Sequence, residues 1–308
     1  MNLIIKSIKH IILTLLIILF ILNINIILSS TKEASILFFN KVFISIFPFI
    51  ILSDILIYYD YHIFLKNTIG KFISKLFNID PNTSIIFIIS MLTSAPTNAV
   101  IIKNMLDNNE IDINTANKII NYTYFPSISF VVGVIGASIY KSLKIGLILW
   151  SCCLFYNILI GIYLRKEKII ENTKKINIIK KDNFFNMLKS SILKGINTSI
   201  IILGNLIIFT IIINIIKEYI DLNPIIMSLI SGVFEMTSGI IDISNLNING
   251  IYKLIMTLFI LTFSSLSIIF QSKSILSDYK INIKRTLIIK LVFSIIILNG
   301  LWIILHFS

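Results

Sequence analysis

Long apolar runs separated by short polar or basic stretches make up most of the chain. A helix needs about 20 apolar residues to cross the hydrocarbon core of a bilayer. Two stretches depart from that pattern, because small and polar residues interrupt them: Thr93-Ser94-Ala95-Pro96-Thr97-Asn98-Ala99-Val100 and Ser231-Gly232-Val233-Phe234-Glu235-Met236-Thr237-Ser238-Gly239. Irregular backbone survives at membrane depth only where protein or a cavity covers it. We therefore predict two re-entrant hairpins, over residues 83–106 and 225–248.

The remaining apolar runs predict about seven membrane spans, at residues 11–28, 34–59, 114–140, 145–164, 195–216, 251–271 and 287–306. The first run follows Lys6 and Lys9 as a signal peptide would. It is longer than a usual signal h-region and no A-x-A cleavage site follows, so we predict an uncleaved span. Pro126 predicts a break in the third span, because proline removes a backbone donor and crowds the preceding turn.

Basic residues predict the orientation of these spans. Lys and Arg gather near the amino terminus, in residues 60–82, in residues 165–194 and after residue 272. The positive-inside rule places such stretches in the cytoplasm. With the amino terminus inside, all these basic stretches lie in the cytoplasm only if both hairpins return to the side from which they start.

Each half of the chain then reads as a span, a hairpin, a polar-interrupted span and another span. An odd number of crossings inverts the second half relative to the first, as in many secondary transporters. We predict an amino-terminal anchor at 1–33, a first repeat at 34–164, a basic cytoplasmic linker at 165–194 and a second repeat at 195–308.

Composition supports an all-α polytopic membrane protein. The 308 residues are 56% hydrophobic with a mean hydropathy of +0.93, which leaves too little polar surface to cover a soluble globule. The net charge of +12 is explained by cytoplasmic anchoring beside membrane lipid, so we expect no nucleic-acid partner. Cys152 and Cys153 are adjacent and fit neither a disulfide framework nor a zinc site.

The chain contains no P-loop, nucleophile elbow or HExxH signature. We therefore expect neither an ATP-driven pump nor a hydrolase, and no enzymatic activity, cofactor or metal.

The candidate substrate-binding residues lie in the two hairpins and the two interrupted spans. Glu235 is an ionisable residue inside a hairpin, which marks a functional site unless a neighbouring helix hydrogen-bonds it near the interface. A half-helix after Pro96 can present unpaired N–H groups to an anion at Thr97 and Asn98, or these residues simply cap the helix. The other candidates are polar residues that packing between membrane helices also explains: Ser94, Thr123, Ser127, Thr237, Ser264, Ser265 and Gln271.

These motifs, in this order, resemble the sporulation integral membrane protein YlbJ family (stage V sporulation protein V), which carries a nucleoside-recognition or Gate domain. The family's S-G-[YF]-P-x-[GN]-A-K hairpin stands here as Thr93 to Val100 and is followed by Thr115-Ala116-Asn117-Lys118 and the break from Thr123 to Phe130. In the second half, Ser231 to Gly239 precedes Phe263-Ser264-Ser265-Leu266-Ser267. The resemblance covers roughly residues 34 to 300. Val100 replaces the family's lysine, which removes one anion contact, and Ser127-Ile128 replaces an Asn-Pro pair.

The resemblance implies a fold similar to concentrative nucleoside transporters and a role in the outer forespore membrane, moving dipicolinic acid from the mother cell toward the spore. We expect a secondary transporter of a small anionic or nucleoside-like solute in a bacterial membrane. Its substrate would bind near the midplane, between Thr97 and Asn98 on one side and Glu235 and the Ser264 region on the other. A non-transporting scaffold for spore-envelope assembly is the alternative, and a homo-oligomer is compatible with either.

Overall fold

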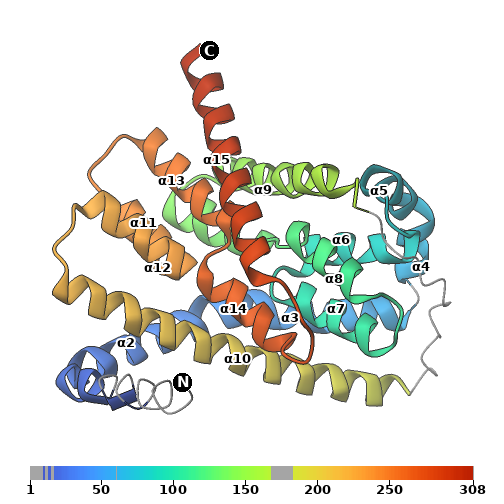
Figure 1. Ribbon diagram of the computed structural model, residues 1–308, viewed down its shortest axis with the longest axis horizontal. Helices are drawn as coiled ribbons and strands as arrows, with labels where there is room; N and C mark the ends of the chain where they lie inside the picture. Colours follow the sequence, from blue (N-terminus) through green and yellow to red (C-terminus); the bar gives the residue numbers. More distant parts are fainter. Residues whose placement is uncertain (1–9, 11–12, 15–16, 60, 168–182, 308) are drawn as a thin grey trace, which may run out of the picture.

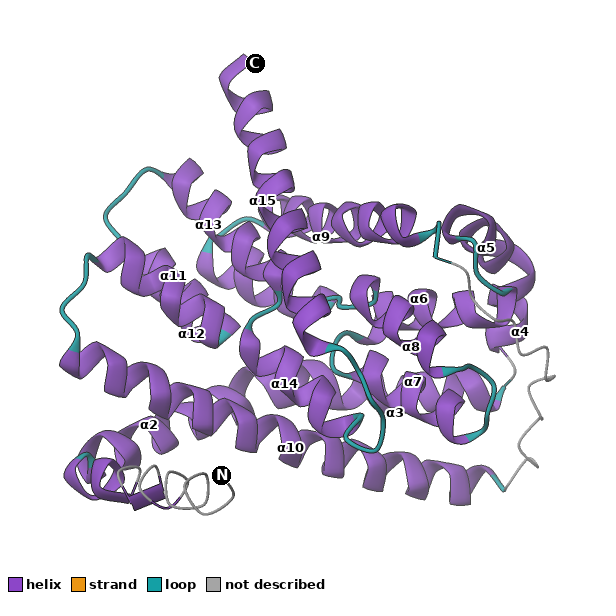
Figure 2. Ribbon diagram, in the orientation of Figure 1, coloured by secondary structure: helices purple, strands orange, loops and turns teal. Residues whose placement is uncertain are grey.

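The computed structural model describes residues 10, 13–14, 17–59, 61–167 and 183–307, and every regular element in these ranges is a helix (Figures 1 and 2). The predicted all-α architecture is confirmed. Parts of the predicted amino-terminal anchor (1–9, 11–12 and 15–16) and of the basic linker (168–182) lie outside the described residues. The α-helices are α2 (Ile24–Leu37), α3 (Phe43–Tyr58), α4 (Tyr61–Leu65), α5 (Lys71–Phe77), α6 (Pro81–Thr93), α7 (Thr97–Asp107), α8 (Ile113–Ile119), α9 (Leu143–Leu164), α10 (Phe184–Tyr219), α11 (Pro224–Phe234), α12 (Met236–Asn245), α13 (Gly250–Phe263), α14 (Leu266–Ile275) and α15 (Ile283–Phe307).

Three helical segments of the described chain are long and apolar enough to cross a membrane: Leu143–Leu164, Phe184–Tyr219 and Gly250–Ile275. They correspond to predicted spans 145–164, 195–216 and 251–271. Each of the three supports the predicted membrane protein.

The first two predicted spans differ from the structure. The sequence suggested a turn between residues 28 and 34, but α2 runs through that stretch and continues through the π-helical segment Phe38–Val42 into α3. The helix is interrupted earlier, at Asn23. Ser29 and Thr31 donate their hydroxyls to backbone carbonyls three and four residues back, so these polar side chains are satisfied inside a helix and require no turn.

The helix α10 is 36 residues long and packs against α2 and α3, as Figure 1 shows along one edge of the molecule. It begins at Phe184, well before the predicted start at 195, because Asn183 caps it by accepting a hydrogen bond from the Phe185 N–H. Lys194 on α10 pairs with Asp54 on α3 at 2.9 Å. Asp54 therefore has a structural partner.

Both predicted hairpins are present as helical hairpins, α6–α7 and α11–α12. Each starts with a capping residue followed by proline: the Asp80 carboxylate accepts from the Asn82 N–H at 2.7 Å, and the Asn223 side chain accepts from the Ile225 N–H at 2.9 Å. α11 and α12 lie side by side in Figure 1. Their contact is so close that a Cβ on Gly239 would overlap the Gly232 backbone.

Both interrupted spans are broken helices. In the first, a 3₁₀ turn after α8 ends at Tyr122 and irregular backbone follows before the π-helical segment Ser129–Ile139. In the second, α13 and α14 are separated by Ser264 and Ser265, whose φ angles are 69° and 49°. Positive φ is unfavourable for residues with a side chain, and such conformations concentrate at functional sites.

Two groups of polar contacts between distant segments lie near the predicted membrane surfaces. The first joins Lys103 to Asp278, Glu167 to Arg285, and the Asn117 side chain to the Asn282 N–H, all in or beside segments predicted to be cytoplasmic. The second joins Lys217 to Asp242 and Asn214 to Glu33, all near predicted external ends. The two groups agree with the sides that the basic residues assign.

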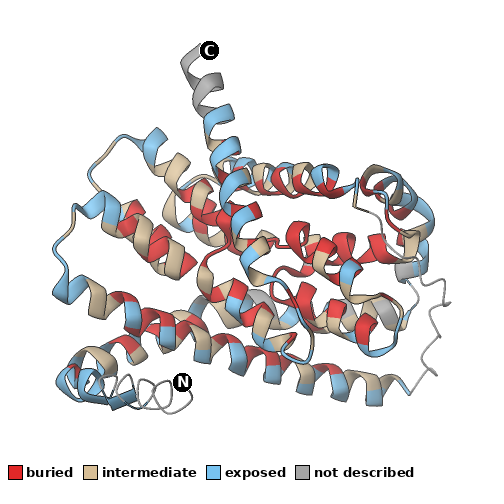
Figure 3. Cartoon of the chain, viewed as in Figure 1, coloured by how far each residue is buried: buried red, intermediate tan, exposed pale blue. Residues whose placement is uncertain are grey.

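The buried residues concentrate where the first hairpin, both broken helices and α9 meet (Figure 3). Phe77, Phe87, Tyr122 and Phe125 form a chain of ring contacts there, with centroids 5.0 to 5.2 Å apart along it. This packing fixes the first break against the first hairpin.

Candidate functional site

A small cavity lies where the two hairpin tips meet the two broken helices. Its volume is about 70 Å³. Five of the predicted site residues line it, from segments far apart in the sequence: Ser94, Ser127, Glu235, Thr237 and Gln271. The other lining residues, mostly apolar, are Val42, Ala95, Pro126, Phe130, Ile202, Leu206, Met236 and Ile268.

The first hairpin tip is bonded to the first helix break. The Ala95 N–H donates to the Phe125 carbonyl at 2.8 Å, and the Asn98 amide donates to the Thr123 hydroxyl at 3.2 Å. Pro96, Asn98 and Thr123 are therefore not among the lining residues, although they hold the lining in place. The structure gives these candidates a positioning role.

The expected free N–H groups at the start of α7 are in part already used. The Thr97 N–H donates to the Ser94 carbonyl at 3.0 Å, and the Ala99 N–H donates to the Pro96 carbonyl at 2.9 Å. Of the two residues named in the prediction, Thr97 therefore has its N–H engaged by the tight turn around Pro96. That Thr97 and Asn98 face an anion stays a prediction.

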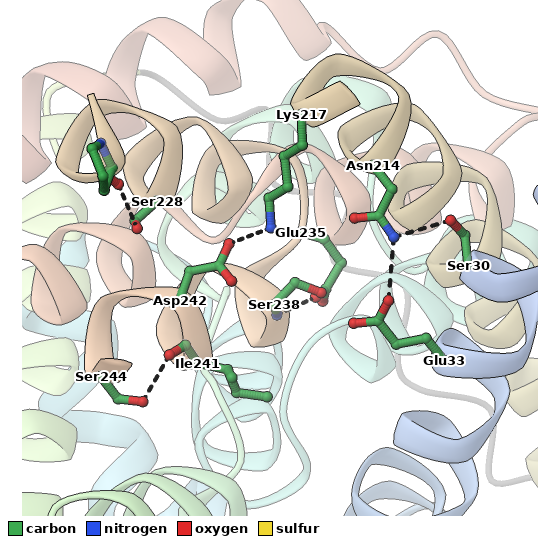
Figure 4. Close-up of polar contacts among 11 residues, drawn as sticks. Ser30, Glu33, Asn214, Lys217, Ser228, Glu235, Ser238, Ile241, Asp242 and Ser244 are labelled. Carbon is green, nitrogen blue, oxygen red and sulfur yellow. Dashed lines mark hydrogen bonds and ion pairs between the residues drawn. The ribbon is translucent and has the colours of Figure 1, made fainter. Parts of the chain in front are cut away.

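Glu235 forms the second hairpin tip and is 4% exposed. Its carboxylate accepts the Ser238 N–H at 2.7 Å and so caps α12, as Figure 4 shows. A carboxylate is favourable at this end of a helix because of the partial positive charge there. Both earlier interpretations of Glu235 therefore describe part of its environment: it is hydrogen-bonded, and it lines the cavity.

Figure 4 also shows how α12 is attached to the long helix α10. Lys217 on α10 reaches Asp242 on α12 at 2.7 Å, and Asn214, one turn earlier on α10, donates to Ser30 and Glu33 on α2. The second hairpin is thus linked through α10 to α2 by side chains near one end of the molecule.

The second break lies behind the cavity. Ser264 and Ser265 do not line it, whereas Gln271 does and donates to the Ser267 hydroxyl at 3.0 Å. The Ser264 hydroxyl accepts a hydrogen bond from Lys290 of α15 at 2.9 Å.

Lys290 is a site residue that sequence reasoning missed. Its side chain is fully buried, and its ammonium lies 4.3 Å from the ring centroid of Tyr124 and 5.6 Å from that of Tyr156. It thereby touches both helix breaks, through Tyr124 in the first and Ser264 in the second. The signal was available, because a lysine inside the apolar run 287–306 is costly and marks a functional site.

Several buried polar atoms around the cavity have no hydrogen-bond partner within the described part of the chain. They are Ser94 Oγ, Thr97 Oγ1 and Asn98 Oδ1 at the first hairpin tip, Ser231 Oγ in the second hairpin and Ser265 Oγ at the second break. An unsatisfied buried polar group costs roughly 1–3 kcal/mol. Of the five, Ser94 Oγ belongs to a residue that lines the cavity, where a polar solute or water can satisfy it.

Comparison with known proteins agrees with the motifs. The chain is 22% identical over 314 residues to the sporulation integral membrane protein YlbJ of Bacillus subtilis (strain 168), and the match covers 89% of this chain and 77% of YlbJ. The resemblance to YlbJ is confirmed at this level of identity. No protein-family model matches the chain, and no solved structure matches it. Together with the apolar helices, the relationship supports an integral membrane protein.

Proposed function

We propose that this relative of YlbJ is a secondary transporter that binds a small anionic or nucleoside-like solute between its two hairpin tips. One observation carries the proposal: a cavity bounded by both hairpin tips, the first helix break and α14, with an unsatisfied polar atom on the lining residue Ser94. Paired discontinuous helices that meet near the bilayer midplane are typical of transporter binding sites. No chemical reaction is assigned to the site.

Matching helix starts support an inverted repeat with about seven spans, similar to concentrative nucleoside transporters. Each hairpin begins with an Asp or Asn before proline, at Asp80-Pro81 and Asn223-Pro224. Each broken helix begins with a capping Asp or Asn, at Asp112 and Asn249. The order of hairpin, broken helix and long helix is therefore repeated together with its local capping chemistry.

The size of the cavity supports a transport cycle in which the hairpins move. A cavity of about 70 Å³ accommodates a few water molecules. An aromatic dicarboxylate needs more room, so the tips must separate for it to bind. Opening at one end would break the contact of Lys103 with Asp278, and opening at the other would break that of Lys217 with Asp242.

The chemistry of the lining sets the range of solutes. Hydroxyls of Ser94, Ser127 and Thr237 can donate to a carboxylate. Glu235 and Gln271 offer acceptors for the N–H and O–H groups of a nucleoside-like solute. By the relationship to YlbJ, we propose dipicolinic acid as the first solute to test and the outer forespore membrane as the location.

Uptake by the purified protein in proteoliposomes tests this proposal, with labelled dipicolinic acid and a nucleoside panel in parallel. We expect Glu235→Gln to lower uptake of the nucleoside-like solutes roughly tenfold, which corresponds to about 1.4 kcal/mol, because the amide keeps the cap but accepts hydrogen bonds from N–H and O–H groups less strongly than the carboxylate. Glu218→Gln is the matched control, since Glu218 is exposed on α10 and should leave uptake unchanged. Folded wild-type protein that moves no solute would instead favour the scaffold for spore-envelope assembly.

A further inference from the structure

Lys290 contacts both helix breaks close in sequence to residues that line the cavity. Tyr124, whose ring faces the Lys290 nitrogen, is two residues before the lining residue Pro126. Ser264, which accepts the hydrogen bond from Lys290, is four residues before the lining residue Ile268. The partners of Lys290 therefore belong to the same two breaks that connect to the cavity wall.

None of the contacts that the structure describes for Lys290 is with a carboxylate. The carboxylate in the cavity wall, that of Glu235, is instead engaged as the cap of α12. α15 packs against α13, α9 and the 3₁₀ turn after α8. From α9 the ammonium meets Tyr156 and Cys153, from the first break Tyr124, and from the end of α13 Ser264. The titratable residue of the 3₁₀ turn, Tyr122, instead contacts Phe77 and Phe87.

No carboxylate forms an ion pair with Lys290 within the described ranges, and only one of its N–H groups has a hydrogen-bond acceptor there. Once the amine is protonated, two aromatic rings supply cation–π attraction to it. These contacts offset only part of the cost of a charge in a low-dielectric interior. A negative charge in the cavity would offset more of it.

We propose that Lys290 takes up a proton when an anionic solute enters the cavity, so that the solute and the proton cross the membrane together. The inference rests on the proposed function. The proton comes from water on the side where the solute enters and forms an N–H bond with the free amine of Lys290. When the solute leaves on the other side, the ammonium loses its counter-charge and releases the proton there. Thermodynamic linkage makes the coupling reciprocal, since the proton then also strengthens solute binding.

A tethered ammonium also makes a dissociable metal cation unnecessary at this position. In many transporters the carbonyls of broken helices coordinate a sodium ion beside the substrate. Here the lysine amine is fixed between the two breaks by α15. Solute uptake should therefore be independent of sodium.

Two measurements on the full-length protein test the inference. The first is uptake of labelled dipicolinate into proteoliposomes, with or without an inward proton gradient and with sodium or potassium as the only alkali cation. The second is the pH change of a weakly buffered detergent solution when dipicolinate is added to the purified protein. We expect the gradient to raise wild-type uptake at least fivefold, sodium to have no effect, and the solution to become more alkaline on binding.

Three variants separate the role of the proton from that of the fold. Lys290→Met should lose both the gradient response and the proton uptake. Lys290→Arg should bind dipicolinate without proton uptake, because a guanidinium stays charged. Lys284→Met is the matched control, since Lys284 is exposed on the same helix and should behave as wild type. Elution as a single folded species and an unchanged melting temperature exclude unfolding, and Lys290→Arg serves if the methionine variant is unstable.

Each contrary outcome overturns either the role of Lys290 or the proposed transport function. A gradient response retained in Lys290→Met, proton uptake retained in Lys290→Arg, or uptake driven by sodium overturns the role of Lys290 and leaves the transporter intact. Uptake of nucleosides without uptake of dipicolinate also overturns the role of Lys290 and leaves the transporter intact, because a neutral solute supplies no counter-charge. A wild-type protein that moves neither dipicolinate nor nucleosides overturns the proposed function together with this inference.

Discussion

Lys118 and Lys290 are both fully buried, but their ammonium groups have different surroundings. Lys118 donates to the carbonyls of Phe77 and Asn78 at 3.3 Å and to that of Glu167 at 3.2 Å. It thus satisfies carbonyls at the end of α5 and just beyond α9, where a positive charge is favourable. Lys290 donates to one hydroxyl, that of Ser264. Lys118 is therefore a structural residue, whereas Lys290 can still donate hydrogen bonds to another group.

Replacing Lys118 should therefore affect stability. We expect Lys118→Met to destabilise the protein by about 2–3 kcal/mol, because it leaves one buried and two partly buried carbonyls with fewer donors. Thermal unfolding in detergent measures this as a lower midpoint. Lys75→Met is the control, since Lys75 is exposed on the neighbouring helix α5. Equal midpoints for the two variants would contradict the structural role.

Individual residues were the hardest level to predict from sequence. Glu235 was identifiable because an acid inside a hairpin is rare, and the structure places it in the cavity wall. Lys290 was visible as a charge in an apolar run, but its partners are Ser264, 26 residues earlier and at a helix break, and Tyr124, in the first half of the chain. Local sequence contains no information on such contacts between distant segments.

At the scale of elements, the turn chemistry was sufficient to place the hairpins and breaks. Proline after a capping residue starts α6 and α11, and small residues mark the tips. The stretch between residues 28 and 34 could not be placed in the same way. Its hydroxyls bond to carbonyls of their own helix, and sequence alone does not distinguish that from a polar turn.

The second hairpin depends on two glycines that touch across it. We expect Gly239→Ala to destabilise the protein by about 1–3 kcal/mol, because the added methyl group would overlap the backbone of Gly232 and force α11 and α12 apart. Gly204→Ala is the control, since a Cβ at Gly204 of α10 meets nothing within 4 Å. Thermal midpoints of the two variants provide the comparison, and a Gly239→Ala midpoint at or above that of Gly204→Ala would refute the close contact.

At the scale of the whole molecule, the distribution of basic residues and the polar contacts lead to the same orientation. Segments assigned to the cytoplasm contact one another, as Lys103 and Asp278 do, and so do segments assigned to the exterior, as Lys217 and Asp242 do. The positive-inside rule rests on charge alone, whereas the contacts rest on packing. Their agreement supports hairpins that return to the side from which they start.

Cysteine labelling of intact cells tests this orientation. We expect a membrane-impermeant maleimide to label Asn247→Cys, after the second hairpin, and to leave Ser277→Cys, after the second broken helix, unlabelled until the cells are permeabilised. Both positions are exposed. The wild-type chain, with Cys152 and Cys153, measures the background. Labelling of both positions, or the reverse pattern, would exclude the proposed layout.

The length of α10 affects how deeply the protein lies in the bilayer. At about 1.5 Å per residue, a 36-residue helix extends for about 54 Å, whereas the hydrocarbon core is about 30 Å thick. Unless the helix is strongly tilted, several turns must project into the headgroups and water. The first turns carry the exposed Lys189 on the side assigned to the cytoplasm. Anionic lipid headgroups attract such a lysine, so we expect this end of α10 to lie at the membrane surface and to set the depth of the molecule in the membrane.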